Sequence, residues 1–238
     1  MSATITPACT ELSFVPVRPV LLCVRRLARV PAVFFLLALS GGAADVEPGF
    51  VSLFDGKSLS GWKLLGKTGE GYLVQDGKIV CPPKGGGNLL TEKEYADFVL
   101  RFEFRLESGS NNGLAIRAPM KAQNLAYDGI ELQIIDNTAA RYKDIKPWQT
   151  HGSLYHVFPA KTGHLNPLGD WNQQEVTVQK RRVEVILNGH KILDADLDSV
   201  SDPEILEKHP GLHRKSGRVG FLGHNEPIEF RRIRIKEL

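Results

Sequence analysis

The clearest strand in this sequence is Phe98-Val99-Leu100-Arg101-Phe102-Glu103-Phe104-Arg105-Leu106-Glu107. Apolar residues alternate along it with residues that are mostly charged. Successive side chains of a β-strand point to opposite faces of the sheet, so one face of this strand is apolar and the other is charged. Such a strand belongs to a sheet that covers a core with one face and meets water with the other, as antiparallel sheets commonly do.

Two β-hairpins extend this interpretation along the chain. Asn188-Gly189 separates the apolar-alternating residues 183–187 from residues 191–193, and Asp76-Gly77 separates residues 72–75 from residues 79–80. Both dipeptides adopt the positive φ angles of the tight turns that match strand twist. Further strands are expected at residues 50–54, 113–117, 130–135, 153–157, 175–179, 218–222 and 228–236.

Helix is scarce in the sequence. Ser201-Asp202-Pro203 predicts an N-cap and a first-turn proline for one short helix that ends near His209. Many short strands separated by Gly and Pro turns indicate a sandwich or a barrel. We therefore expect an all-β, antiparallel two-sheet β-sandwich over residues 45–238, as a single domain. Trp62 and Trp171 are expected to be core anchors at strand entries.

Residues 1–44 have the pattern of a secretory signal. Arg25, Arg26 and Arg29 precede the apolar residues 33–39, and small residues follow up to Ala44. A basic region, a short apolar region and a small-residue cleavage site predict export, with a secreted or periplasmic mature protein cut near Ala44. The apolar run is shorter than the ~20 residues that span a bilayer, so no stable membrane span is expected.

The region before the apolar run is unusually long for a signal. We expect that its first residues are a mis-assigned extension and that translation starts at the codon of Val24 or Val30.

Removing the leader changes the charge of the protein. Residues 1–44 hold four Arg and one Glu, so Lys+Arg falls from 30 to 26 and Asp+Glu falls from 27 to 26. A mature chain of net charge near zero has no basic excess for nucleic acid. Cys9 and Cys23 leave with the leader, so Cys81 has no intramolecular disulfide partner.

The most informative polar segment lies at residues 127–136. Strand parity places Glu131 and Gln133 on one face, with Leu132 and Ile134 toward the core. A carboxylate beside an amide can bind hydroxyl groups and move a proton. Asp136 has the opposite parity and would join them only through a bulge. A solvated strand face explains the same pattern equally well.

Other candidate residues are more isolated in the sequence. Arg117 has a permanent charge that could hold an oxyanion or pair with Glu131. An unperturbed histidine titrates near neutral pH, so His151 or His224 could move a proton. The remaining candidates for sugar binding are Asn112, Tyr155 and Trp148. Each has an ordinary structural explanation as well, in a turn, a surface or a core.

The seven His residues show no pair at the spacing of a zinc protease, so no metal site is predicted from spacing. There is also no phosphate-binding loop and no Gly-x-Ser-x-Gly nucleophile motif.

Taken in order, these motifs resemble the 3-keto-disaccharide hydrolase domain family over essentially all of residues 49–238. The residues that carry the resemblance are Leu53-Phe54-Asp55-Gly56-Lys57, Ser60-Gly61-Trp62, Leu90-Thr91-Glu92, Asn111-Asn112-Gly113 with Arg117, Gly129-Ile130-Glu131-Leu132-Gln133-Ile134-Ile135-Asp136, Gly152 with Tyr155, Asp170-Trp171-Asn172, Leu187-Asn188-Gly189, and His224 followed by Phe230-Arg231. The chain departs from the family pattern at Leu222, Asn225 and Arg232.

The resemblance implies a concanavalin-like jelly roll, exported by bacteria, that cleaves glycosides whose glucose ring is oxidised at C3. A C3 ketone acidifies the C2 proton, so a base can remove it and the C1 substituent can leave by elimination. On this basis the expected base is Glu131 or His224. Arg117 or a divalent metal ion is expected to stabilise the enolate. The residues expected to hold a small carbohydrate are Gln133, Asn112, Tyr155, Asp136, His151 and Trp148.

Two other hypotheses remain open at this point. A retaining glycosidase of the laminarinase-like type would use two carboxyl groups roughly 5 Å apart, here Glu131 and Asp136. A carbohydrate-binding module would present an aromatic platform without catalysis, and the fold does not distinguish it from an enzyme. Nothing in the sequence indicates an oligomeric state.

Overall fold

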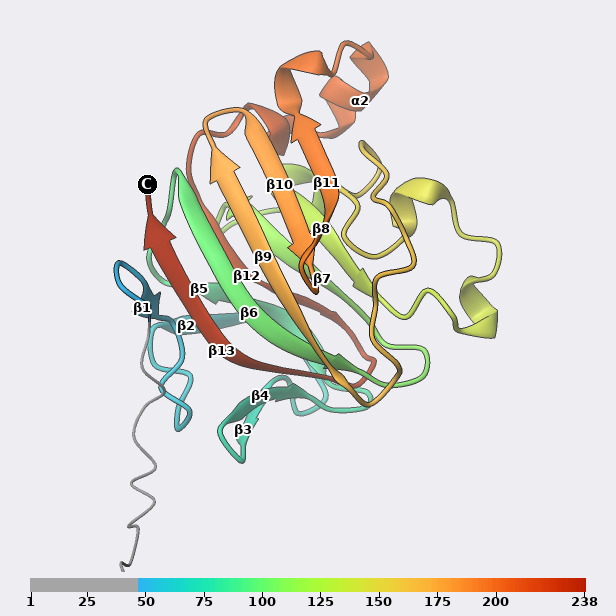
Figure 1. Ribbon diagram of the computed structural model, residues 1–238. Helices are drawn as coiled ribbons and strands as arrows, with labels where there is room; N and C mark the ends of the chain where they lie inside the picture. Colours follow the sequence, from blue (N-terminus) through green and yellow to red (C-terminus); the bar gives the residue numbers. More distant parts are fainter. Residues whose placement is uncertain (1–46) are drawn as a thin grey trace, which may run out of the picture. The chain divides into compact units, whose positions relative to one another are not determined.

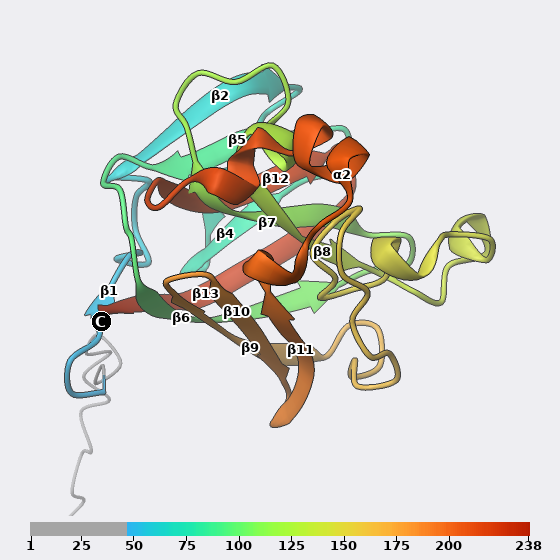
Figure 2. The ribbon, with the colours of Figure 1, turned by 90° about the horizontal axis from the view of Figure 1, so that it is seen from above.

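The structure, a computed structural model, describes residues 47–238, so the expected export signal and its cleavage near Ala44 lie outside the described residues. Within residues 47–238, strands build two antiparallel sheets that face one another (Figures 1 and 2). The predicted all-β, two-sheet sandwich is confirmed. No helix among these residues is long and apolar enough to cross a membrane.

The larger sheet has eight strands and the smaller sheet has five. The larger one runs in the order β11 (His190–Asp196), β10 (Arg182–Leu187), β9 (Trp171–Gln179), β6 (Phe98–Leu106), β13 (Ile228–Glu237), β4 (Lys78–Cys81), β3 (Leu73–Gln75), with β1 (Val51–Ser52) also on β13. The smaller one runs in the order β2 (Trp62–Thr68), β5 (Gly86–Thr91), β12 (Arg218–His224), β7 (Asn111–Ala118), β8 (Ile130–Ile135).

The core lies between the two sheets and confirms the alternation of β6. The five apolar residues of β6 that face the core, Phe98, Leu100, Phe102, Phe104 and Leu106, are each at most 2% exposed. From the opposite sheet, the Phe221 ring packs edge-on against Phe102 at 5.8 Å between centroids and stacks on Phe230 at 3.7 Å. Trp62 is buried as predicted, and its indole N–H donates to the Leu53 carbonyl at 2.7 Å.

Both predicted hairpin turns are confirmed. Asn188 and Gly189 have φ angles of 49° and 83° between β10 and β11, and Asp76 and Gly77 have φ angles of 50° and 73° between β3 and β4. Positive φ at both central residues gives the turn the twist of its flanking strands.

The predicted short helix is also confirmed. It is α2 (Pro203–Lys208), and the Asp202 carboxylate accepts from the Glu204 backbone N–H at 2.9 Å. The other α-helix within residues 47–238 is the single turn α1 (Leu125–Asp128). Short 3₁₀ turns lie at residues Ala140–Tyr142, Pro147–Gln149, Leu197–Ser199 and Pro210–His213.

Three local predictions are wrong or incomplete. Residues 153–157 form only bridge contacts at Leu154, because the chain turns back on itself there and Leu154 also bridges Phe158. The strand expected at residues 50–54 is limited to β1. Trp171 is not a core anchor: it is half-buried on the outer face of the larger sheet, where the Arg231 guanidinium lies 3.8 Å from its ring centroid.

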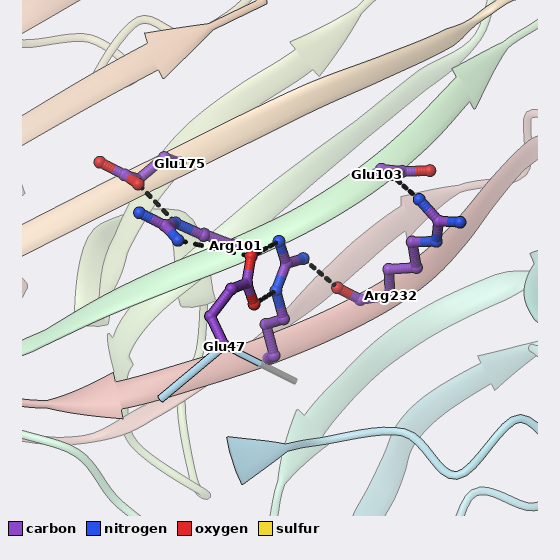
Figure 3. A network of polar contacts seen from close by, with 6 residues as sticks. Glu47, Arg101, Glu103, Glu175 and Arg232 are labelled. Atoms are coloured by element: carbon purple, nitrogen blue, oxygen red, sulfur yellow. Dashed lines mark hydrogen bonds and ion pairs between the residues drawn. The ribbon is translucent and has the colours of Figure 1, made fainter. Parts of the chain in front are cut away.

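The outer face of the larger sheet carries a network of ion pairs (Figure 3). Arg101 on β6 donates to Glu175 on β9 at 2.6 Å, and Arg232 on β13 donates to Glu103 on β6 at 3.0 Å. Glu47 accepts two hydrogen bonds from Arg234, at 2.5 and 2.6 Å. The network joins three adjacent strands and secures the first described residues to this sheet.

Candidate functional site

Strand β8 places Glu131 and Gln133 on the outer face of the smaller sheet. Leu132 and Ile134 point into the core, and the two polar residues alternate with them, as the sequence predicts. Glu131 is 4% exposed, and both polar side chains line a pocket of about 210 Å³ over this face. This pocket is smaller than the roughly 300–1,000 Å³ of typical small-molecule sites.

The segment around Leu154 extends the sheet beyond β8. The Tyr155 N–H donates to the Glu131 carbonyl at 2.9 Å, the Gln133 N–H donates to the Ser153 carbonyl at 2.9 Å, and Leu132 bridges Leu154. Side chains directly opposite in antiparallel strands share one face. Tyr155 is therefore the immediate neighbour of Glu131 on the pocket side.

On the other side of Glu131 lies His224, the last residue of β12. Its Nε2 atom is 3.8 Å from Glu131 Oε1. The carboxylate reaches toward His224 over Gly113 on β7, the strand between them. A Cβ atom at position 113 would lie 1.9 Å from Glu131 Oε1. The carboxylate can therefore occupy this position only if residue 113 is glycine.

The electrostatics of this pair favour a charged imidazole. The Glu131 carboxylate raises the pKa of His224 above its ordinary value of 6.5, against the opposing effect of burial, and Glu226 adds to the rise. Glu131 Oε1 is buried and has no hydrogen-bond partner among the described residues. Because a buried unpaired carboxylate oxygen is costly, it marks a group ready to accept a ligand or a proton.

Strand parity also determines which asparagine faces the pocket. Asn112 is completely buried and points inward, where its amide donates to the Tyr72 hydroxyl at 3.0 Å. Asn111, one residue earlier, lines the pocket and accepts from the Gln133 amide at 3.1 Å. Asn112 is thus not placed to bind substrate. The apolar Leu114 and Ile116, which share its parity, are the sequence feature that identifies Asn112 as inward-facing.

Arg117 is not part of this group of residues. It sits at a bulge with φ of 52°, and its buried guanidinium donates to the backbone carbonyls of Arg214 and Lys180. The nearest carboxylate is Asp97, at 3.7 Å. The expected pairing of Arg117 with Glu131 is wrong, because the bulge turns the side chain from the pocket toward the end of the sandwich.

Asp136 is held by the backbone beside it. Its carboxylate accepts from the Gly109 N–H at 2.9 Å and from both the N–H and the hydroxyl of Thr138, at 2.8 and 2.6 Å. Burial raises the pKa of Asp136, but these hydrogen bonds together outweigh it and leave the pKa below its ordinary value. Asp136 does not line the pocket, and it shapes the loop that follows β8.

His151 and Trp148 also lie outside the pocket lining. His151 is buried, stacks on Phe104 at 5.0 Å between centroids and shares a hydrogen bond of 2.9 Å with Gln174. Burial lowers its pKa to about 4, so it is neutral. Trp148 packs edge-on against Tyr155, with 5.3 Å between the ring centroids.

Several pocket residues were not identified from the sequence. Most of them lie in the short helices and loops between strands, whose position depends on the folded sheet. They are Asn124, Ala126, Tyr127, Tyr142, Ile145 and Gln149, together with Asn111 and Ile135 on the strands. Tyr127 belongs to α1 and stacks on Tyr155 at 6.4 Å between centroids. No repeated pattern in the sequence marks these loop positions.

Within residues 47–238, no group of three or more His, Cys, Asp and Glu side chains gathers to hold a metal ion. In the pocket, only Glu131 and His224 belong to these residue types. A divalent ion there would need amide oxygens or water as its other ligands. The divalent ion considered from the sequence stays a prediction.

Comparison with known proteins gives one family match and several relatives. Residues 49–236 match the family of 3-keto-alpha-glucoside-1,2-lyase-like domains. A curated relative is the 3-keto-disaccharide hydrolase of Bacteroides thetaiotaomicron. It is 26% identical over 230 residues, which cover 80% of this chain and 79% of the relative.

Two solved structures from Parabacteroides distasonis, both of candidate glycosyl hydrolases, share the fold. One is 26% identical to this chain. The matched region covers 80% of this chain and 94% of the solved chain, and the TM-score is 0.67. The other is 24% identical. The matched region covers 79% of this chain and 99% of the solved chain, and the TM-score is again 0.67. The sandwich is the jelly roll expected from the sequence.

Proposed function

The chain belongs to the family of 3-keto-alpha-glucoside-1,2-lyase-like domains, and from this premise we propose that it cleaves glycosides whose glucose ring carries a ketone at C3. The relative named a 3-keto-disaccharide hydrolase supports the same substrate class. The proposed reaction is removal of the C2 proton, elimination of the C1 substituent, and addition of water to the product.

The observation that carries the proposal is the Glu131–His224 pair, with 3.8 Å between Oε1 and Nε2 in one small pocket. Elimination acts on two adjacent carbons, so its base and its acid must approach neighbouring atoms. A base and an acid this close suit that requirement. Glu131 is the proposed base. His224, whose raised pKa favours the imidazolium, is the proposed acid that protonates the leaving oxygen.

The proposed steps balance without an oxidant or a reductant. Glu131 takes the C2 proton, and the electron pair of that bond forms C2=C3 as the carbonyl oxygen becomes an enolate. The enolate then re-forms the ketone and a C1=C2 double bond, while the C1–O bond breaks and the departing oxygen takes a proton from His224. Water adds back with its oxygen at C1. After its proton exchanges with solvent, Glu131 returns a proton to C2, and His224 takes a proton from the attacking water, so the sum is hydrolysis.

The position of Asp136 disfavours a retaining glycosidase. That mechanism requires two opposed carboxyl groups roughly 5 Å apart at the same sugar. The Asp136 carboxylate is engaged by Gly109 and Thr138 instead, and it does not line the pocket. The convergence of polar side chains in a pocket likewise supports an enzyme over a binding module with a flat aromatic platform.

The test is release of the leaving group from matched substrates. Purified protein is incubated with a 3-keto-glucoside and, separately, with the parent glucoside. We expect release from the keto form only, and a loss of roughly 10²–10⁴-fold in kcat for Glu131→Gln, the range of a missing general base. Glu70→Gln, an exposed carboxylate elsewhere, is the matched control. Release from the parent glucoside, or full activity of Glu131→Gln, would contradict the proposal.

A further inference from the structure

Tyr155, Glu131 and His224 form a row across the outer face of the smaller sheet. The strand order is β12, β7, β8 and then the segment around Leu154, so Glu131 on β8 stands between the other two. His224 approaches Glu131 from β12 at 3.8 Å. Tyr155 is joined to Glu131 from the opposite side by the 2.9 Å backbone hydrogen bond.

The reacting atoms of a 3-keto-glycoside have the same order. The C3 oxygen lies on one side of C2, and the C1 oxygen lies on the other. A base in the middle of the row meets C2, and the two flanking groups then meet the two oxygens. Because His224 is the proposed acid for the C1 oxygen, the C3 oxygen is left to the Tyr155 end.

We propose that Tyr155 is a catalytic residue whose hydroxyl donates a hydrogen bond to the C3 oxygen as the enolate forms, and that the row fixes the orientation of the sugar ring. This inference rests on the proposed function and deepens it. The enolate carries its charge on that oxygen, and a preorganised donor is most effective where charge develops. The tyrosine keeps its proton, so no further proton transfer enters the balance.

The surroundings of Tyr155 suit a fixed donor. Trp148 packs edge-on against its ring at 5.3 Å, and Tyr127 stacks on it at 6.4 Å between centroids. The hydroxyl stays protonated because burial, Tyr127 and Glu131 all raise the pKa of Tyr155. Arg117, the donor expected from the sequence, is engaged by the Arg214 and Lys180 carbonyls. Tyr155 therefore supplies a donor on the side of Glu131 away from His224.

The test compares two variants on two leaving groups. The substrates are a 3-keto-disaccharide, whose leaving alkoxide needs a proton, and 4-nitrophenyl 3-keto-glucoside, whose leaving phenolate does not. Tyr155→Phe should lose roughly 10²–10³-fold in kcat on both substrates, the usual effect of removing one oxyanion donor. His224→Ala should lose activity mainly on the disaccharide. Tyr95→Phe, which removes the hydroxyl of a buried tyrosine that does not line the pocket, is the control for folding.

Each outcome has a distinct meaning. If the wild-type protein cleaves both substrates and Tyr155→Phe keeps its kcat, the role of Tyr155 is refuted while the proposed function stands. If Tyr155→Phe is defective only on the disaccharide, Tyr155 serves the leaving group and the orientation is reversed. If the wild-type protein cleaves neither substrate, the proposed function fails, and the inference fails with it.

Discussion

Gly113 shows how a single residue determines the geometry of the candidate site. The Glu131 side chain lies over the backbone of β7, which is accessible only because Gly113 has no Cβ atom. From this position the carboxylate reaches His224, and its unpaired oxygen remains in the pocket. Position 113 is therefore part of the site although it contributes no functional group.

Gly113→Ala should reduce activity because it displaces the Glu131 carboxylate. The new methyl group would force the Glu131 carboxylate out of its place, since the two atoms would be 1.9 Å apart. We expect a loss of at least 10²-fold in kcat, comparable with removal of the base itself. The double variant Gly113→Ala/Glu131→Gln should be no less active than Glu131→Gln alone. Additive losses would mean that Gly113 acts by another route.

The protonation of His224 gives a second test at the residue scale. Its pKa should lie above 6.5 in the wild-type protein and should fall in Glu131→Gln, because Glu131 is the main cause of the rise. Titration of the imidazole protons by NMR measures both values. Equal pKa values in the two proteins would contradict the assignment of the pair.

The sign of this shift also fixes its effects on stability and on rate. A raised pKa in the folded state stabilises the fold fully at pH values below 6.5, and the contribution is lost as pH rises through the raised pKa. With His224 as the acid, kcat on a disaccharide should decrease over the same rise in pH.

Among the structural elements, the strands could be predicted from the sequence better than the segments between them. The alternation of β6 and the two Asx-Gly turns follow from local physical chemistry, and all three are confirmed. Residues 153–157 carry the same local pattern without forming a full strand, because the chain turns back at Leu154. The bulge at Arg117 also could not be predicted from the local sequence. Regular alternation along β7 would place the Arg117 side chain on the same face as Glu131, and the bulge turns it away.

Leu154 tests whether the segment beyond β8 depends on core packing. Leu154 is 1% exposed and packs in the core beside Leu132. Leu154→Ala should lower the free energy of unfolding by about 2–5 kcal/mol, the usual cost of such a cavity. It should also lower activity, since Tyr155 follows directly. Leu168→Ala, at a 44% exposed position, should change the free energy of unfolding by less than about 0.5 kcal/mol. Chemical denaturation measures both, and equal effects would contradict the placement of Leu154.

At the scale of the whole molecule, the two faces of the sandwich are specialised differently. The outer face of the larger sheet carries arginines paired with glutamates, including Glu47 at the start of the described chain (Figure 3). The outer face of the smaller sheet carries the pocket with the unpaired Glu131 oxygen. The carboxylates of the larger sheet are paired with arginines, whereas Glu131 on the smaller sheet keeps an unpaired oxygen in a pocket. The smaller sheet is therefore the face on which we expect a ligand to bind. Sequence alone placed Glu131 and Gln133 together, but the loop residues that close the pocket required the fold.

We propose that the chain is exported and that its leader is removed near Ala44. The basic and apolar residues before Ala44 predict cleavage there, which leaves Glu47 close to the mature N-terminus. We expect N-terminal sequencing of the protein recovered from the periplasm or medium to begin within a few residues of Asp45. Recovery of an intact leader on the cytoplasmic protein would contradict this prediction.

The central claim, that the bond is cleaved by elimination through C2, is tested most directly in D₂O. The protein is incubated with a 3-keto-glucoside, and the released sugar is analysed by NMR and mass spectrometry before uncatalysed exchange occurs, with 3-keto-glucose alone as the control. Abstraction of the C2 proton and its return from solvent predict deuterium at C2 of the released sugar. Released sugar that retains its original proton at C2 would contradict the account.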